Sequence, residues 1–274
     1  MKSGKTMLIT GCSGGLGKAL ALAASAAGYQ VIATARKPQD LAVLQALGLD
    51  VLALDVCSSA SVAAAVQQLK EQGMGLDILV NNAGFGAIGA VLDASPEQMR
   101  RQFDTNVFAV AELTQACLPL LMQQQGLVVN IGSVSARLTT PFAGWYCASK
   151  AALHCISDAM RMELAPLGVR VLTVQAGAIA TGFADNAQAG VVASLTEQSL
   201  WWRFRQGIEQ RANASQQHPT SAEKLSQQLL SEIAKPGCTG LVRLGNGAVL
   251  LALLQALMPR TILDKVLQKK FALR

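Results

Sequence analysis

The sequence has little histidine, no closely spaced cysteine pair and few charged side chains. Its two histidines are His154 and His218, and its 6 cysteines never occur at a C-x-x-C spacing. Zinc sites and the disulfide frameworks of small secreted domains depend on such spacings. We therefore expect no metal site, and we expect reduced thiols, as in cytosolic proteins.

Long hydrophobic runs are also lacking. Residues 1–6 lead straight into a strand-like run, without the apolar segment or cleavage site of a signal peptide. The longest apolar stretch, residues 248–258, contains Gln255 and is too short to span a bilayer. We expect a cytoplasmic protein.

What the chain does have is apolar material and a modest basic excess. Hydrophobic residues make up 51% of the chain and charged residues 15%, which suits a large core and excludes a disordered chain. There are 23 Lys and Arg against 17 Asp and Glu, a formal net charge of +6. This surplus suits an anionic ligand, a membrane surface or a nucleic acid, and does not choose among them.

Short apolar runs rich in β-branched residues alternate with segments of helical period. The predicted strands are residues 7–10, 31–34, 51–54, 78–80, 127–131, 169–174 and 240–244. The predicted helices are residues 15–27, 58–72, 97–124 and 146–165. Apolar strands between helices indicate a mostly parallel sheet with helices on both faces. We predict an α/β, doubly wound Rossmann fold of about seven strands.

We interpret residues 1–274 as one Rossmann-type domain, because no linker-like segment interrupts residues 1–180. Residues 1–182 are predicted to be the cofactor-binding and catalytic core. Residues 183–222 are polar and rich in Gln and Ala, and we predict that they form a substrate lid. Residues 245–274 are predicted to form an amphipathic helical tail, broken at Pro259.

A glycine-rich loop lies between the first predicted strand and helix. Residues 10–17 are Thr-Gly-Cys-Ser-Gly-Gly-Leu-Gly. Glycines there permit a tight turn and let a pyrophosphate approach the N–H groups of a helix N-terminus. A plain turn is the alternative, but the position between strand and helix favours dinucleotide binding. The predicted cofactor contacts are Gly11, Ser13, Gly15, Leu16 and Gly17.

The end of the second predicted strand indicates which dinucleotide binds. NAD-preferring sites place Asp or Glu there, whereas an Arg accommodates the 2′-phosphate of NADP. This chain has Ala35 and Arg36, with Lys37 and Ser13 as further candidate contacts. A solvated arginine at a strand end is the alternative, and we predict NADP(H).

Asp55 and Val56 follow the third predicted strand and are further candidate cofactor contacts. The Asp55 carboxylate has two alternative roles that the sequence does not separate. It either accepts a hydrogen bond from the adenine amino group or caps the helix that begins near Ser58.

Tyr146 and Lys150 are four residues apart and therefore share one helical face. A free tyrosine titrates near 10 and is a poor base at neutral pH. A neighbouring ammonium is expected to lower that pKa, which suits general acid–base catalysis. The spacing alone is common on surface helices, and it gains meaning from the glycine loop.

Together these motifs resemble the short-chain dehydrogenase/reductase family over roughly residues 5–182. The loop at residues 10–17 is similar to the family's cofactor loop, and residues 81–84 (Asn-Asn-Ala-Gly) match its signature after strand four. Asn106 falls where the family has a helix asparagine, and Ser133 precedes Tyr146 by the spacing of the family's catalytic serine. Ser135 lies two residues further on, and the spacing favours Ser133.

The resemblance implies a role for each matched residue. Tyr146 would exchange a proton with the reacting oxygen, and Ser133 would hydrogen-bond that oxygen. Lys150 would hold the nicotinamide ribose and tune Tyr146. Asn106 would hold a water that links Lys150 to solvent, or else satisfy backbone groups within its helix.

The resemblance also implies further cofactor contacts. They are Asn82, Ala83, Gly84, Tyr146, Lys150, Gly177, Ile179 and Thr181. The family usually has Pro-Gly after strand six, whereas this chain has Ala176 and Gly177. Because the fixed φ of proline is lost, we expect catalysis to persist with a more mobile loop over the nicotinamide.

The substrate is indicated only in outline. Residues 146–150 and 34–36 resemble the branch that contains 17β-hydroxysteroid and retinol dehydrogenases, and the tail resembles 1-acyldihydroxyacetone-phosphate reductases, which implies a bulky apolar substrate. Phe183, Trp201, Trp202 and Phe204 would suit an apolar lid, with plain packing as the alternative.

The tail places Ile262, Leu263, Val266, Leu267 and Phe271 on one helical face. Such a stripe flanked by Lys265 and Lys269 either docks on its own domain or a second subunit, or lies on an anionic membrane.

We therefore predict an NADP(H)-dependent oxidoreductase that interconverts a carbonyl and an alcohol on a small apolar, lipid-, steroid- or retinoid-like substrate. The alternative is a catalytically silent NADP(H)-binding sensor or scaffold on the same fold. We expect a homo-oligomer, with peripheral membrane contact of the tail as an alternative role for that segment. No nucleic-acid module is evident.

Overall fold

The computed structural model describes residues 4–180 and 195–274, and its main sheet is parallel with the strand order β3-β2-β1-β4-β5-β6-β9. The strands are β1 (Thr6–Ile9), β2 (Gln30–Ala35), β3 (Asp50–Ala53), β4 (Ile78–Asn81), β5 (Leu127–Ile131), β6 (Arg170–Ala176) and β9 (Gly240–Leu244). Each neighbouring pair is parallel. The predicted doubly wound fold of seven strands is confirmed.

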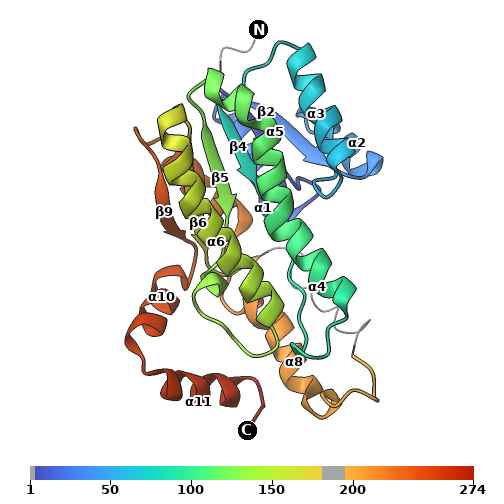
Figure 1. Cartoon of the computed structure of the whole chain (residues 1–274), viewed down its shortest axis with the longest axis vertical. Helices are drawn as coiled ribbons and strands as arrows, with labels where there is room; N and C mark the ends of the chain where they lie inside the picture. The colour runs from blue at the N-terminus through green and yellow to red at the C-terminus, as the bar shows by residue number, and fades with distance from the viewer. Residues whose placement is uncertain (1–3, 181–194) are drawn as a thin grey trace.

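Helices cover both faces of this sheet. One layer contains α1 (Gly15–Ala26), α2 (Pro38–Ala46) and α9 (Ala222–Ile233). The other contains α3 (Ser59–Glu71), α5 (Ala109–Gln123) and α6 (Gly144–Leu164), of which α5 and α6 cross in front of the sheet in Figure 1. The helix α4 (Pro96–Phe103) continues through a π-helical turn (Asp104–Phe108) into α5.

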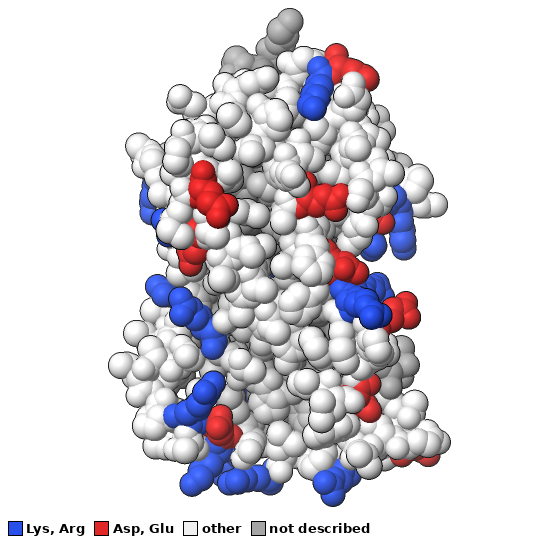
Figure 2. Space-filling model, viewed as in Figure 1, with Lys and Arg blue, Asp and Glu red and all other residues white. Residues whose placement is uncertain are grey.

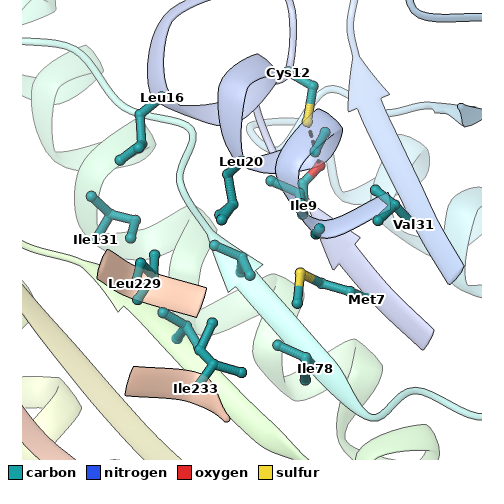
Figure 3. Close-up of a cluster of buried hydrophobic side chains, with 14 of the residues drawn as sticks. Met7, Ile9, Cys12, Leu16, Leu20, Val31, Ile78, Ile131, Leu229 and Ile233 are labelled. Atoms are coloured by element: carbon teal, nitrogen blue, oxygen red, sulfur yellow. Dashed lines mark hydrogen bonds between the residues drawn. The ribbon is translucent and has the colours of Figure 1, made fainter. Parts of the chain in front are cut away.

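The core forms where these layers meet the strands. Figure 3 shows Met7, Ile9 and Ile78 from the sheet facing Leu20 of α1 and Leu229 of α9. β1, β4 and β5 are buried along their whole length, because helices cover both of their faces. This explains why their sequences are continuous apolar runs rather than alternating ones.

A buried polar network crosses the second layer next to the carboxyl ends of β4 and β5. The Asn81 Nδ2 donates to Asn130 Oδ1 (2.8 Å) and to Thr114 Oγ1 of α5 (3.1 Å). The Asn130 Nδ2 donates in turn to Ser157 Oγ of α6 (2.8 Å). Because each of these buried groups has a partner, the network fixes α5 and α6 relative to the strands.

One helical stretch in the described chain, Pro96–Gln123, is long and apolar enough to cross a membrane by length and composition. Half of its most apolar window is buried inside the fold, where α5 packs on β4 and β5. Its apolar character is therefore that of a core helix.

Three helices from the last third of the chain lie together at one end of the molecule. They are α8 (Arg205–Asn213), α10 (Ala248–Leu257) and α11 (Arg260–Lys270), which lie at the lower end of Figure 1. A small parallel pair, β7 (Ile179–Ala180) and β8 (Thr220–Ser221), joins these helices to the end of β6. Short 3₁₀ turns occupy Val134–Ala136, Ala165–Leu167, Trp202–Phe204 and Ala214–Gln216.

The tail docks on its own domain. Leu267 and Phe271 are buried in a cluster with Ile208 of α8, and Leu263 packs against it. Ile262 lies on the opposite side, with 50% of its surface exposed. The predicted single apolar face is therefore divided into an inner and an outer half.

Among the described residues, three helices were not predicted: α2, α8 and α9. In α9 the buried residues Leu225, Leu229 and Ile233 do repeat with helical spacing, and Ser221 caps the helix by accepting a hydrogen bond from the Lys224 N–H (3.2 Å). Polar, Gln-rich residues surround these three positions, which made the helical spacing difficult to recognise in the sequence.

Candidate active site

A cavity of about 960 Å³ lies at the carboxyl ends of the strands. The chain leaves β1 towards one edge of the sheet and β4 towards the other, so this is the topological switch point where such sheets bind ligands. The predicted site residues that line the cavity are Gly11, Ser13, Gly15, Leu16, Arg36, Asp55, Val56, Asn82, Ala83, Gly84, Ser133, Tyr146, Lys150, Gly177 and Ile179. Thr181 and Phe183 lie outside the described residues.

The glycine loop has the form of an anion cradle. Gly11 has φ 72° and Gly15 has φ 54°, values that an L side chain rarely adopts. The N-cap of α1 is Gly14, and no side chain caps the first turn. The N–H groups at this helix end therefore face the cavity without a side-chain acceptor, and the loop fits a pyrophosphate.

Buried neighbours hold the loop in place. The Cys12 N–H donates to the Thr34 carbonyl (2.8 Å), and its thiol donates to the Ile9 carbonyl (3.2 Å), as Figure 3 shows for the latter bond. Burial raises the pKa of Cys12 to about 12, so this thiol is structural rather than reactive. Leu16 extends from the loop into the core.

Gly17 lies beneath the loop rather than along the cavity. A Cβ there would collide with the Gly11 carbonyl oxygen and with the Asn82 side chain. The Asn82 Nδ2 donates to the Thr10 carbonyl (2.8 Å), which ties the end of β4 to the loop. Gly17 is thus needed for packing under the cradle.

The two cationic candidates at the end of β2 are placed differently. Ala35 and Arg36 line the cavity, whereas Lys37 does not and instead precedes α2 as its N-cap residue. Further along, Asp55 Oδ1 accepts a hydrogen bond from the Cys57 N–H (3.1 Å). The alternative in which Asp55 caps the next helix is wrong, because Ser58 caps α3.

Three predicted catalytic side chains meet at the middle of the cavity. Ser133 follows β5, and Tyr146 and Lys150 come from the first turns of α6. The Tyr146 and Ser133 side chains are hydrogen-bonded to each other, and the Ser135 N–H donates to Ser133 Oγ (3.1 Å). Lys150 Nζ donates to the Ile131 carbonyl (2.8 Å). All three predicted catalytic side chains are buried.

Burial is the largest cause of the pKa shifts of Tyr146 and Lys150. It raises the pKa of Tyr146, while the hydrogen bond with Ser133 and the charge of Arg211 act in the opposite direction. Burial lowers the pKa of Lys150 to about 8. The expectation that Lys150 lowers the pKa of Tyr146 is therefore wrong: desolvation dominates, and the opposing groups are Ser133 and Arg211.

Asn106 lies in the π-helical turn, just behind the cavity wall. Its Nδ2 donates to the Phe85 carbonyl and to Ser149 Oγ (both 3.0 Å), and its Oδ1 accepts from the Phe85 N–H (3.2 Å). Its partners lie outside its own helix, so it does not merely satisfy that helix. A Cβ on Gly84 would lie 3.0 Å from Asn106 Oδ1 and 3.7 Å from Lys150 Nζ, so Gly84 keeps both groups close together.

Two buried residues, Gln102 and His154, support the site although they were not predicted as site residues. Gln102 Oε1 accepts from the Ala87 N–H (2.7 Å), and its Nε2 donates to the Phe85 carbonyl (2.8 Å), which fixes the loop after β4. His154 Nε2 accepts from the Ser133 N–H (3.3 Å). A glutamine one helical turn before Asn106 and a histidine one turn after Lys150 were the available signals.

The end of β6 is held by backbone bonds in place of a proline. The Gly177 N–H donates to the Leu244 carbonyl (2.8 Å), and the Ala178 N–H donates to Asn246 (3.2 Å). A Cβ on Gly177 would collide with the Asn246 carbonyl oxygen. The described part of this segment, through Ala180, is therefore fixed; the mobility expected further along falls outside the described residues.

The far end of the cavity is largely apolar. Its lining there includes Leu138, Trp145, Leu195, Ile208, Leu251, Leu267 and Phe271. The predicted lid aromatics Trp201 and Phe204 pack beneath it, with ring centroids 6.0 Å apart, and do not line it. Leu195 and Ile208 of the predicted lid thus form an apolar wall together with Leu251, Leu267 and Phe271 of the tail.

Known proteins share this architecture. The family model described as short chain dehydrogenase matches residues 5–191. The short-chain dehydrogenase ptmH of Penicillium ochrochloron is 37% identical over 270 residues, with 97% of each chain covered. The NADPH-dependent 1-acyldihydroxyacetone phosphate reductase of Schizosaccharomyces pombe is 34% identical over 226 residues, which cover 81% of this chain and 76% of that one.

The crystal structure of a short-chain dehydrogenase from Streptomyces avermitilis superposes with a TM-score of 0.82. It is 29% identical and covers 99% of this chain, while 98% of its own chain is covered. The likeness therefore extends through the tail.

Burial lowers the pKa of His154 to about 4, with the charges of Lys150 and Arg137 acting in the same direction. Between pH 6.5 and 4 the unfolded chain binds a proton here that the folded chain does not. We therefore expect the free energy of unfolding to fall as the pH falls through this window, by roughly 3 kcal/mol. Urea denaturation across the window measures it.

His154→Gln keeps an acceptor for Ser133 and should flatten this pH dependence, whereas His218→Gln, at an exposed position, should leave it intact. Identical pH slopes for the wild type and His154→Gln would contradict the assignment.

Proposed function

This chain belongs to the short-chain dehydrogenase family and is an oxidoreductase of that family, and we propose that it interconverts a carbonyl and a primary or secondary alcohol with NADP(H) on an apolar substrate. The observation that carries the proposal is the hydrogen-bonded pair Ser133–Tyr146, buried beside Lys150 in the cavity that also contains the glycine loop. A cofactor-binding sensor, the alternative, has no need for this pair.

The preference for NADP(H) rests on the end of β2. Ala35 and Arg36 line the cavity there, so no carboxylate at these positions repels a 2′-phosphate. A guanidinium pairs with phosphate through a planar set of donors, and Arg36 supplies one. The Schizosaccharomyces pombe relative is NADPH-dependent by name, which agrees with this preference.

Each side chain in the middle of the cavity has a separate task. When bound, the nicotinamide supplies or accepts the hydride. Tyr146 donates a proton to the carbonyl oxygen during reduction and takes it back from the alcohol during oxidation. Ser133 donates a hydrogen bond to the same oxygen, with its own Oγ held by the Ser135 N–H.

Lys150 and Asn106 act behind this pair. The Lys150 ammonium, held by the Ile131 carbonyl, would bind the nicotinamide ribose with its remaining protons. Asn106 positions the loop at Phe85 and lies near Lys150, where we propose that a water passes protons to solvent. Burial raises the pKa of Tyr146, so the phenol is protonated at neutral pH and can donate its proton to a carbonyl oxygen.

Tyr146→Phe should lower kcat for carbonyl reduction roughly 10²- to 10⁴-fold, because it removes the hydroxyl that transfers the proton and bonds to Ser133, while NADPH should still bind through the glycine loop and Arg36. NADPH absorbance, followed with aldehydes, ketones, steroids, retinal and acyl ketones, measures turnover. Tyr29→Phe, at the other tyrosine of the chain, is the matched control. Tight NADPH binding without turnover of any substrate by the wild type would favour the sensor.

Arg36→Ala should raise KM for NADPH roughly 10- to 100-fold, as expected for the loss of a charge-assisted hydrogen bond. KM for NADH should change little. Lys37→Ala, whose side chain does not line the cavity, should leave both values nearly unchanged. A wild type that uses NADH better than NADPH would refute the assignment.

The outer face of the tail supports a further part of the proposal, peripheral contact with an anionic lipid surface by a cytoplasmic, homo-oligomeric enzyme. Val249, Leu250, Leu253 and Leu257 of α10 are each at least half exposed and share one helical face. Figure 2 shows blue Lys and Arg side chains along the lower end of the molecule, where α11 lies in Figure 1. The exposed cations of α11 are Arg260, Lys265, Lys269 and Lys270.

Leu250→Glu combined with Leu257→Glu should abolish sedimentation with phosphatidylserine vesicles and leave turnover of a water-soluble carbonyl unchanged, because both side chains point outward. Light scattering on the same samples gives the oligomeric state. No binding of the wild type, or a smaller particle for the variant, would show that lipid does not cover this face.

A further inference from the structure

Arg211 is a cation inside the apolar end of the cavity. It comes from α8, one turn after the buried Ile208, and both line the cavity together with Tyr146. The helix is held against the tail, because a Cβ on Gly207 would collide with the Phe271 carbonyl oxygen. The guanidinium is therefore placed by a packed helix rather than by a surface loop.

Among the residues that the structure describes, the hydrogen-bond partners of Arg211 are neutral groups. Its Nε donates to Thr140 Oγ1 (2.6 Å), and its guanidinium contacts the Cys147 side chain. Within residues 4–180 and 195–274, no carboxylate lies within 4.0 Å of it; the ion pairs found there join Arg161 to Asp158 and Lys235 to Glu232. Thr140 orients the guanidinium, and no acidic side chain of the described residues compensates its charge.

A guanidinium in such a place is unfavourable unless it has a function. Arg211 is half-buried, and because arginine stays protonated at any ordinary pH, it cannot reduce the cost of this partial burial by losing a proton. Partly removing a charge from water without a counter-charge is unfavourable for the fold. An anionic ligand would supply the counter-charge, and the fork of N–H donors suits a carboxylate or a phosphate.

The remaining walls define the rest of that ligand. Leu138, Ile208 and Leu267 offer aliphatic contacts, and Lys270 adds a second cation at the wall formed by the tail. Arg211 also lies close enough to Tyr146 for its charge to act on the phenol. The anionic group would therefore sit near the reacting oxygen, with the apolar body extending along α8 and the tail.

We propose that Arg211 binds a carboxylate or phosphate of the substrate, so that the substrate is an anionic amphiphile whose carbonyl lies close to its charged group. This inference rests on the proposed function. Arg211 acts as a specificity-determining residue, and the proton transfer by Tyr146 remains as described above.

A different role would be purely electrostatic, in which Arg211 assists Tyr146 and contacts no substrate. The two roles differ in one measurable respect. If Arg211 binds substrate, its loss weakens anionic ligands and spares neutral ones. If it only assists Tyr146, its loss slows neutral and anionic substrates by the same factor and shifts the pH profile of both.

Ligand binding is measured on the full chain with saturating NADP⁺, which fills the phosphate cradle. Trp145 lines the cavity, so its fluorescence reports binding of decyl phosphate, decanoate and decan-1-ol. The wild type should bind the two anions roughly 10- to 100-fold more tightly than the alcohol. The comparison of phosphate with carboxylate identifies the preferred group.

Arg211→Gln should abolish this preference, and Arg211→Lys should keep part of it. Arg205→Gln is the matched control, because Arg205 starts the same helix, is exposed and does not line the cavity. Equal affinity of the wild type for all three probes overturns the proposal. So does an Arg211→Gln variant that keeps the preference or that loses decan-1-ol as strongly as decyl phosphate.

Turnover then links the subsite to catalysis. With NADPH, kcat/KM for 2-oxododecanoate should exceed that for its methyl ester in the wild type, and Arg211→Gln should equalise the two. Equal loss for both substrates would assign Arg211 the electrostatic role and overturn the proposal. If the wild type reduces no carbonyl at all, the proposed function fails, whereas the fluorescence preference still decides whether the anion subsite exists.

Discussion

The parallel register of β1, β4, β5 and β6 is the constraint on which the site depends. Parallel strands end at the same edge, so the residues that follow them converge although they are far apart in sequence. The Thr10 hydroxyl, at the end of β1, accepts hydrogen bonds from the Asn82 and Ala83 N–H groups after β4 (both 2.9 Å). Asn81 and Asn130 are register partners and hydrogen-bond through their side chains. A slip of either strand would break these bonds and separate the glycine loop from Ser133.

The site also requires that α6 is held in a fixed position along β5. Lys150 is hydrogen-bonded to the Ile131 carbonyl, His154 to the Ser133 N–H and Ser157 to Asn130, so one face of the helix contacts three residues at the end of β5. Tyr146 is on the same face, one turn earlier. Its hydroxyl reaches Ser133 because these three contacts fix the helix rather than because of its own bond alone. The polar residues on this face of α6 therefore both hold the helix in place and form part of the proposed catalytic group.

The sequence sufficed for features that depend on local pattern. Seven apolar runs predicted the strands of the main sheet, although not β7 and β8, and the spacing of Tyr146 and Lys150 placed both on one face of α6. It did not suffice where distant segments meet. His154 and Gln102 act on backbone groups of other elements, and Arg211 enters the cavity because α8 folds back against the tail. The direction of the Tyr146 pKa was missed for the same reason: it is set by desolvation, and burial is a property of the folded chain. Lys37 illustrates the reverse case, since it is adjacent to Arg36 in sequence but is turned away by the start of α2.

Burial affects the titratable side chains of the cavity and Arg211 differently. Burial raises the pKa of Tyr146 and lowers that of Lys150, so both are shifted towards their neutral forms, whereas the Arg211 guanidinium keeps its charge at ordinary pH. A charge that cannot be titrated away, next to a phenol that must stay protonated for reduction, stabilises negative charge wherever it develops nearby. That charge appears on the reacting oxygen during proton transfer and is permanent on an anionic substrate. Arg211 therefore lies where its cation can select a substrate that carries a permanent negative charge. The Ser133–Tyr146 pair stabilises the negative charge that develops on the reacting oxygen during the reaction.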